Sequence, residues 1–249
     1  MNQHRTPMTY RLNALAVSIV LLAVLTGCSR PAQRADNAAS LYQVSSFNAL
    51  ADGGFEAITT VGQLKQHGNL GIGTFEGLNG EMIVLDGRIY QARADGTVAE
   101  PADSAGVPFA SVTRFVPTLS RQLGALSGYA ALTTTLDGLM PRKDSFYAIR
   151  VQAAFAHVKV RTIAGQSKPY PTLADALKAQ VFSERSTITG TIVGIWAPDY
   201  VGGTTVAGYN LHFISADHAF GGHLVEAEFS SAQADIQELR DFELALSTR

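Results

Sequence analysis

The sequence predicts an α/β fold of the α+β kind, with two packed halves, mixed or antiparallel β-sheets and peripheral helices. Its 249 residues are 46% hydrophobic, which is enough for one large domain or two small ones with a proper core. The 23 glycines suit a β-rich protein with many turns. Asn-Gly or Asp-Gly pairs stand between apolar-rich runs at three places, and such pairs are strong signals for tight hairpin turns.

The charges of the chain are nearly balanced, with 19 Lys and Arg against 21 Asp and Glu and a net charge of −2. This leaves no basic field that could hold a nucleic acid, so no nucleic-acid partner is expected. The single cysteine excludes an internal disulfide.

Residues 1–27 are predicted to be a lipoprotein signal peptide. Arg5 and Arg11 give a positive start, and the apolar run at 12–25 is short for a membrane-spanning helix. The letters LTGC at 25–28 resemble a bacterial lipobox, in which Cys28 is acylated and the signal is cut before it. We therefore expect an extracytoplasmic envelope protein anchored to the lipid bilayer, with residues 28–40 as a polar tether. A plain secretory signal and an uncleaved anchor helix are the alternatives.

Residues 41–167 are predicted to form the N-terminal half. A strand is expected at 41–45, a helical turn at 47–54, and a short helix within 59–68 with a threonine N-cap and Gly68 as C-cap. A β-meander follows over 70–77, 81–85, 88–93 and 97–100, through Asn79-Gly80, Asp86-Gly87 and Asp95-Gly96. The remaining expectations are a strand at 109–117, mostly helix at 119–139, and a pair of strands at 145–155 and 157–164.

Residues 168–249 are predicted to form a β-rich C-terminal half, which begins at the sequence KPYP. A helix is expected at 172–180. Strands are expected at 186–198, 207–214 and 221–230, and the segment 230–246 is interpreted as a turn of helix followed by a strand.

The segment AGYNLHFISADHAFGGHLVE, at residues 207–226, predicts a hairpin that carries histidines. Alternate residues of a strand share a face, so Asn210 and His212 point the same way, and His223 begins the returning strand. Three such positions suit a divalent ion such as Zn²⁺, although asparagine is a weaker ligand than histidine. Surface or hydrogen-bonded histidines are the ordinary alternative. His218, in the turn, is expected to be solvated, or to move in as a substitute ligand.

A long stretch of the chain is similar to a known family. Residues 41–92 closely resemble the N-terminal half of bacterial α-acetolactate decarboxylases. The motifs FYAIRV, VKVRT, QSKPYPTL, GTIVGIWAPDY, GYNLHFISAD and FGGHLVE follow in the family's order. The resemblance covers nearly all of 41–246 and implies an acetolactate-decarboxylase-like fold.

The resemblance also implies an activity and a site. Members of the family convert acetolactate, a small 2-hydroxy-3-oxo acid, to acetoin and CO₂ at a Zn²⁺ ion held by three histidines. Matched by position, His212 and His223 are two of these metal ligands. Asn210 stands at the third ligand position. Glu81 and Arg161 match catalytic residues, and Thr74 matches a residue of the substrate pocket.

The chemistry of decarboxylation explains these residue types. A divalent ion acts as a Lewis acid on the substrate oxygens, Arg161 supplies a fixed cation, and a carboxyl group such as Glu81 delivers a proton. Without the resemblance each residue has an ordinary interpretation. Glu81 is then a solvated residue at a strand start and Thr74 a routine strand threonine, while Arg161 belongs to a solvated basic face with His157 and Lys159.

Two departures from the family leave two hypotheses open. An amide at position 210 should weaken zinc binding. Family members also continue into a tail with a second active-site glutamate, whereas this sequence stops at Arg249. One hypothesis is a working acetolactate decarboxylase, and the resemblance to the family implies that it forms a homodimer. The other is a catalytically impaired homologue that serves as a ligand-binding or structural envelope lipoprotein.

Overall fold

The computed structural model describes Met1 and residues 39–247. Cys28, the predicted signal peptide and most of the predicted tether lie outside the described residues. Within residues 39–247, no helix is both long enough and apolar enough to cross a membrane. The proposed division of the folded part at residue 168 stays a prediction.

A seven-stranded mixed sheet contains most of the N-terminal strands and the last strand of the chain. Strand β1 pairs with β15 in parallel, and all other neighbouring strands of this sheet pair in antiparallel fashion. In spatial order the strands are β15 (Asp241–Ala245), β1 (Ser40–Val44), β8 (Phe109–Thr113), β3 (Leu70–Thr74), β4 (Glu81–Leu85), β5 (Arg88–Ala92) and β6 (Val98–Ala99). A separate small sheet pairs β2 (Thr59–Thr60) with β7 (Gly106–Val107).

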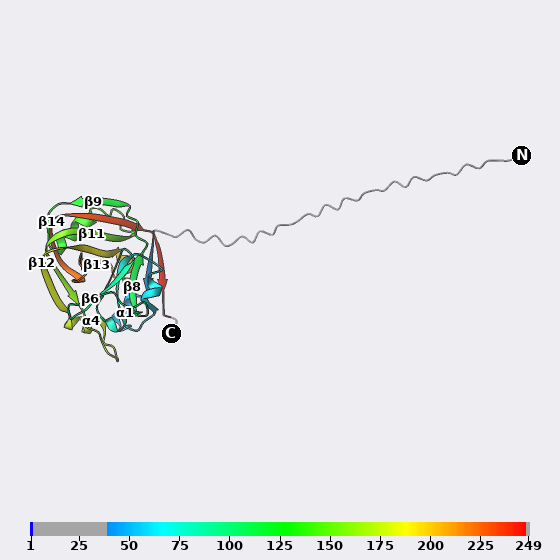
Figure 1. The fold of residues 1–249 in the computed structure, drawn as a ribbon, viewed down its shortest axis with the longest axis horizontal. Helices are drawn as coiled ribbons and strands as arrows, with labels where there is room; N and C mark the ends of the chain where they lie inside the picture. Colours follow the sequence, from blue (N-terminus) through cyan, green and yellow to red (C-terminus); the bar gives the residue numbers. More distant parts are fainter. Residues whose placement is uncertain (2–38, 248–249) are drawn as a thin grey trace. The chain divides into compact units, whose positions relative to one another are not determined.

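A second, six-stranded sheet is antiparallel and contains the long strands that lie side by side in Figure 1. Its main path runs through β10, β14, β11, β12 and β13, and β9 also pairs with β14. The additional pairing of β13 with β14 closes four of these strands into a ring. The bounds are β9 (Leu119–Leu123), β10 (Leu126–Ser127), β11 (Phe146–Thr162), β12 (Val181–Ala197), β13 (Gly208–Ser215) and β14 (Gly221–Leu239).

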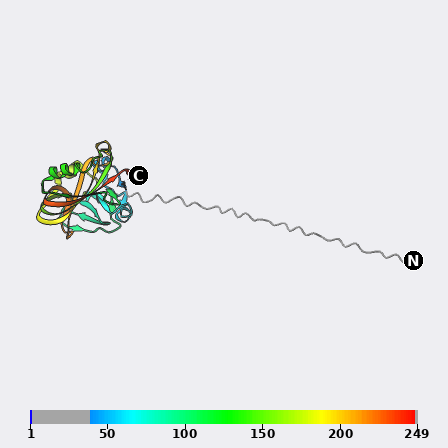
Figure 2. The same cartoon turned by 90° about the horizontal axis from the view of Figure 1, so that it is seen from above.

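The helices are short and peripheral. Helix α3 packs on β14 and β10, and Figure 2 shows it as the green coil outside the strands. The predicted threonine cap is confirmed, because the Thr60 side chain accepts from Gln63 N in a capping box. The bounds are α1 (Phe47–Ala51), α2 (Val61–Leu64), α3 (Tyr129–Asp137), α4 (Leu173–Ala176), and the 3₁₀ turns η1 (Glu76–Leu78), η2 (Leu177–Ala179) and η3 (Asp199–Val201).

The predicted C-cap of α2 is wrong. The helix ends at Leu64, with Lys65 as its C-cap. Position 68 requires a glycine for a different reason, since a Cβ atom there would lie 2.7 Å from both the N and O atoms of Thr113. Close approach of two backbones therefore explains this glycine.

Of the three predicted tight turns, only Asp86-Gly87 forms a two-residue hairpin. Its φ angles are 51° and 80°, as a turn with two left-handed residues requires, and it joins β4 directly to β5. The Asn79-Gly80 and Asp95-Gly96 pairs lie in longer loops, because Thr74 pairs with Glu81 and Ala92 pairs with Val98. The meander itself is confirmed.

The helix predicted over 119–139 is wrong in its first part, where β9 and β10 lie and α3 begins only at Tyr129. Both short strands pair with β14, a partner about a hundred residues away that local periodicity does not reveal. The two strands predicted at 145–155 and 157–164 are one strand, β11, whose pairing with β14 shifts register near Phe155. The helical turn predicted after residue 230 is also wrong, since β14 continues to Leu239.

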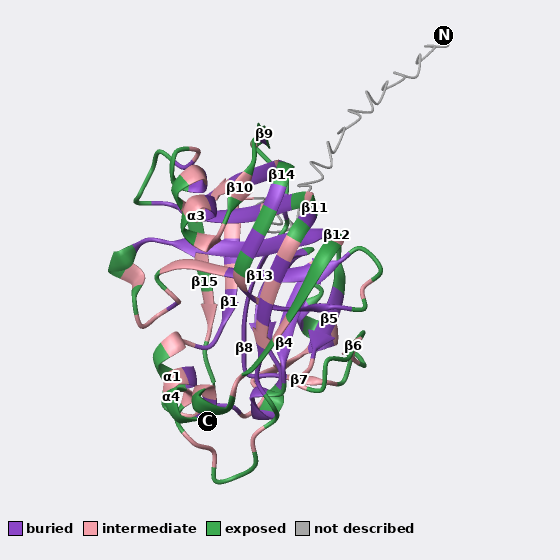
Figure 3. Ribbon diagram, turned by 90° about the vertical axis from the view of Figure 1, so that its left-hand side faces the viewer, coloured by how far each residue is buried: buried purple, intermediate pink, exposed green. Residues whose placement is uncertain are grey.

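The two large sheets pack against each other through a shared apolar core. Figure 3 shows buried residues in the strands of both sheets. One cluster combines residues of the first sheet with residues of the second: Leu41, Leu70, Ile72 and Ile83 with Phe146, Val193, Ile195 and Ile214. This packing brings β3 and β4 onto β12 and β13, and β4 onto β14. The predicted α/β class, with mixed and antiparallel sheets and peripheral helices, is confirmed.

Candidate active site

Five strands bring five of the predicted site residues together. Glu81 begins β4 and pairs with Thr74, the last residue of β3. His212, on β13, pairs directly with His223, at the start of β14, and His223 also pairs with Arg161 on β11. The first sheet thus contributes an acid and a hydroxyl, and the second contributes two imidazoles and a guanidinium.

The carboxyl group of Glu81 lies between the basic groups. Its Oε2 atom is 3.5 Å from His212 Nε2, and its Oε1 atom is 3.6 Å from Arg161 Nη1. The ring centroids of His212 and His223 are 5.2 Å apart. One ligand atom from each of Glu81, His212 and His223 lies within 4.8 Å of the others.

His212 is held in one tautomer. Its Nδ1 atom is 2.8 Å from the carbonyl oxygen of Met82, which can only accept, so Nδ1 carries the proton. The lone pair is then on Nε2, the atom that faces Glu81. The pKa of His212 is lowered to about 3, chiefly by burial; the hydrogen bond to the Met82 carbonyl opposes the shift, and the charge of Arg161 adds to it. Burial, with His212 and Arg161, also lowers the pKa of His223 well below its usual value. Both imidazoles are therefore neutral near pH 7.

Glu81 is shifted in the opposite direction. Burial raises the pKa of its carboxyl group to about 7, although the nearby Arg161 guanidinium opposes the shift. The carboxyl group therefore exchanges its proton near neutral pH, which is the range in which a general acid or base works best.

Thr74 lines the cavity and also fixes the chain that leads to Glu81. Its hydroxyl donates to the carbonyl oxygen of Gly80, the residue before Glu81, at 2.7 Å. The same hydroxyl keeps free acceptor capacity toward the cavity.

Asn210 lies two residues before His212 and lines the same cavity. Among the buried side-chain nitrogen and oxygen atoms of residues 39–247, its Oδ1 atom has no hydrogen-bond partner. An unpaired buried carbonyl oxygen costs about 1–3 kcal/mol. A carbonyl oxygen of a residue that lines the same cavity as two neutral imidazoles and a carboxyl group suits a divalent cation, so the residues present fit the metal ion that the resemblance implies.

The cavity has a volume of about 190 Å³, and most of its wall is apolar. Helices α1 and α4, with the turn η2, cover one side. Sequence reasoning missed this wall, because the only signal was the amphipathic pattern of two short helices far apart in the chain. The apolar lining comprises Phe47, Leu50, Leu78, Phe109, Ile163, Leu173, Leu177 and Val206.

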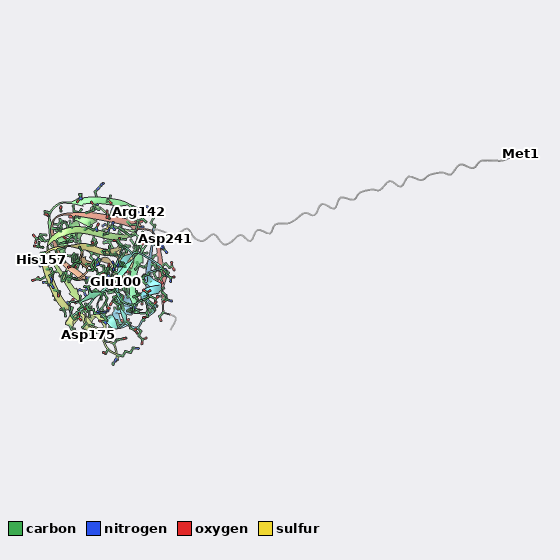
Figure 4. All side chains as sticks on the ribbon, viewed as in Figure 1. Met1, Glu100, Arg142, His157, Asp175 and Asp241 are labelled. Carbon is green, nitrogen blue, oxygen red and sulfur yellow. The ribbon has the colours of Figure 1, made fainter. Side chains whose placement is uncertain are left out.

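The other basic residues that the sequence offered lie elsewhere. His218 packs against the ring of Tyr90, with ring centroids 4.5 Å apart. His157 lies at the outer side of the molecule, as labelled in Figure 4, and contacts Glu184. Lys159 lies over the ring of Phe182. Arg161 instead lines the cavity, with its Nη1 atom 3.6 Å from Glu81 Oε1, so it is not simply part of a solvated basic face.

Comparison with known proteins gives a consistent result. The family described as alpha-acetolactate decarboxylase matches residues 41–249. An alpha-acetolactate decarboxylase of Methanosarcina mazei is 40% identical over 209 residues, which is 83% of this chain and 73% of that protein. One from Methylococcus capsulatus is 39% identical over 204 residues, which is 82% of this chain and 78% of that protein.

Solved structures agree with the sequence comparison. The crystal structure of alpha-acetolactate decarboxylase from Bacillus subtilis strain 168 superposes with a TM-score of 0.82 at 33% identity. It covers 84% of this chain and 90% of that one. A Staphylococcus aureus protein described as similar to alpha-acetolactate decarboxylase gives a TM-score of 0.81 at 32% identity, with 83% of this chain and 89% of that chain covered.

Proposed function

Because the chain belongs to the alpha-acetolactate decarboxylase family, we propose that it converts 2-acetolactate to acetoin and CO₂ in the cavity around Glu81, Arg161, His212 and His223. The observation that carries the proposal is the meeting of these four side chains from both sheets. They combine a fixed cation, neutral metal ligands and a carboxyl group with a pKa of about 7.

Arg161 is proposed to bind the oxygens of the substrate. A guanidinium is always charged and presents several donors in a fixed plane, which suits a carboxylate beside a hydroxyl and a ketone. The side chain is largely buried, so its attraction for an anion is screened less than that of a surface arginine. The apolar wall leaves room for the two methyl groups of acetolactate.

His212 and His223 would hold a divalent cation through their ring nitrogens, since both rings are neutral. When bound, such an ion supplies a Lewis acid that stabilises negative charge on the substrate oxygens. The hydrogen bond from His212 Nδ1 to the carbonyl oxygen of Met82 fixes the ring with Nε2 toward the cavity.

Glu81 is proposed to carry the proton. When the bond between the carboxylate carbon and its neighbour breaks, CO₂ leaves and the electron pair moves toward the ketone, giving an enediolate. The carbon that lost CO₂ must then take up a proton to give acetoin. Burial makes the carboxyl form of Glu81 abundant near pH 7, and its place on one wall delivers the proton to one face of the substrate.

The predicted lipidation of Cys28 completes the proposal. We propose that the chain is a lipid-anchored enzyme on the extracytoplasmic side of a bacterial membrane. The support is the sequence alone, in the order positive start, apolar run and LTGC. The proposal that the chain forms a homodimer likewise depends only on its membership of the family.

The experiment is an acetoin assay on the full chain, purified in detergent and supplied with 2-acetolactate. We expect acetoin and CO₂ in equal amounts, loss of activity after a chelator, and recovery when a divalent cation is returned. His218→Asn serves as a matched control, because it removes an imidazole in the turn of the hairpin, outside the cavity. Acetoin formation no faster than the spontaneous rate, in protein that binds a divalent cation, would reject the activity and favour the ligand-binding alternative.

A further inference from the structure

The unpaired oxygen of Asn210 points to a role beyond filling space. Buried polar atoms are nearly always hydrogen-bonded, so an unsatisfied one needs an explanation. Within residues 39–247 the Oδ1 atom of Asn210 stands out for this reason, and Asn210 is one of the residues that line the cavity. A cation is a partner that a carbonyl oxygen can bind in place of a hydrogen-bond donor.

The strand places this oxygen on the side of the metal ligands. Asn210 and His212 occupy alternate positions of β13 and therefore share a face. Both line the cavity together with His223, the direct cross-strand partner of His212. Leu211, the residue between them, is fully buried in the core on the opposite face.

We propose that Asn210 Oδ1 is the third protein ligand of the cation, beside the ring nitrogens of His212 and His223. This inference rests on the proposed function, because it concerns the same cation. It assigns to this chain a ligand set of two nitrogens and one neutral oxygen.

The composition of that set has a consequence for the choice of metal. Imidazole nitrogens favour zinc, whereas carbonyl and carboxylate oxygens suit harder ions such as Mn²⁺. The centre still binds Zn²⁺ more tightly than Mn²⁺, as the general order of affinities requires. Its preference for Zn²⁺ is smaller than that of the same centre with an imidazole at position 210.

A further consequence concerns Glu81. Its carboxyl group is near enough to His212 and His223 to act as the third ligand itself. Ligation by Asn210 instead leaves the Glu81 carboxyl group outside the ligand set. The two assignments make opposite predictions for substitutions at positions 81 and 210.

The experiment measures cation binding without reference to turnover. The full chain in detergent is stripped with a chelator, and its Kd for Zn²⁺ and for Mn²⁺ is measured by competition with an indicator and by the electron paramagnetic resonance signal of free Mn²⁺. The variants are Asn210→Leu, Asn210→His and Glu81→Gln, with His218→Asn as the matched control. Circular dichroism and thermal unfolding establish that each variant is folded.

We expect Asn210→Leu to raise the Kd for Zn²⁺ about tenfold or more, and Glu81→Gln to raise it less. Asn210→His should lower the Kd for Zn²⁺ and raise the ratio of the Mn²⁺ Kd to the Zn²⁺ Kd by about tenfold. Because this variant gains affinity, it keeps the test decisive even if Asn210→Leu does not fold. His218→Asn should match the wild type.

Three outcomes would overturn the inference: an unchanged Kd in Asn210→Leu, a larger loss in Glu81→Gln than in Asn210→Leu, or no change of metal preference in Asn210→His. The proposed function is tested separately by acetoin formation. A wild type that forms acetoin and binds Zn²⁺ with no contribution from Asn210 refutes only the inference. A wild type that binds no cation refutes both the inference and the metal-assisted reaction.

Discussion

Glu81 and His212 are buried titratable side chains whose pKa values shift in opposite directions. The pKa of Glu81 is raised from 4.5 to about 7, so its contribution to stability is fully present below pH 4.5 and is lost as pH rises through 7. The pKa of His212 is lowered from 6.5 to about 3, so its contribution is present above pH 6.5 and is lost as pH falls toward 3. Between these limits the two effects partly cancel.

Glu81→Gln should remove the alkaline loss of stability in metal-free protein. The buried carboxylate costs up to about 3 kcal/mol at pH 8, at about 1.4 kcal/mol for each pKa unit. At about 2–4 °C per kcal/mol, the Tm of the variant should therefore exceed that of the wild type by several degrees at pH 8 and by little at pH 5. Thermal unfolding in a chelator at both pH values measures this. A Tm difference that does not grow with pH would contradict the burial argument, and Glu184→Gln controls for the loss of one charge at an exposed position.

Arg161 can be tested by a change that keeps its charge. Arg161→Lys retains a cation but loses the planar pair of donors, so we expect kcat/KM for 2-acetolactate to fall by about 10²-fold or more, with a rise in KM. Initial rates of acetoin formation over a range of substrate concentrations give both constants. A lysine variant with wild-type kinetics would show that Arg161 does not bind the substrate oxygens.

At the scale of elements, the β13–β14 hairpin sets the distance between His223 and Arg161. Gly222 has φ of 153°, and a Cβ atom on it would lie 2.8 Å from the carbonyl oxygen of Arg161. The absence of a side chain therefore lets β14 approach β11 at the site.

Gly222→Ala should push these two strands apart. We expect a loss of about 1–3 kcal/mol in the free energy of unfolding and a weaker affinity for Zn²⁺, because His223 moves with the strand. Denaturant unfolding and the zinc titration measure the two effects. Gly124→Ala is the matched control, since a Cβ atom at Gly124 would meet no atom within 4 Å. Equal effects of the two variants would refute a special role for Gly222.

The elements that sequence reasoning predicted correctly are those with local causes. The two-residue turn at Asp86-Gly87, the threonine cap of α2 and the alternation around His212 all follow from neighbouring residues. The prediction of a helix at residues 119–127 was wrong because these residues form strands only by pairing with the distant β14, which local sequence patterns do not reveal. The long strand β11 was divided in two because its irregular pairing near Phe155 interrupts the apolar pattern.

At the scale of the whole molecule, the site exists because two sheets pack together. Glu81 and His212 are 131 positions apart in the sequence, and no periodicity relates them. Only the resemblance to a family brought Glu81, Arg161 and Thr74 into the predicted site beside the hairpin. The structure adds the apolar wall of the cavity and the unpaired oxygen of Asn210, both of which depend on packing between distant segments.

The proposed anchor is also a property of the whole molecule. In a bacterium that matures lipoproteins, the full chain should enter the detergent phase of a phase-separation assay and should incorporate labelled fatty acid. Cys28→Ser should abolish the incorporation of fatty acid, because it removes the acceptor thiol. Labelling that persists in Cys28→Ser, or a wild type without label, would contradict lipidation at this residue.

The central claim is that the carbon–carbon bond to the carboxylate of 2-acetolactate breaks in this cavity and that Glu81 then supplies a proton. The most direct test compares the rate and the enantiomeric composition of acetoin formed from 2-acetolactate by wild type and by Glu81→Gln. We predict rapid formation of one enantiomer by the wild type, and a rate lower by about 10²-fold or more in the variant, as expected for the loss of a general acid. Equal rates and equal enantiomeric composition in the two proteins would contradict the account.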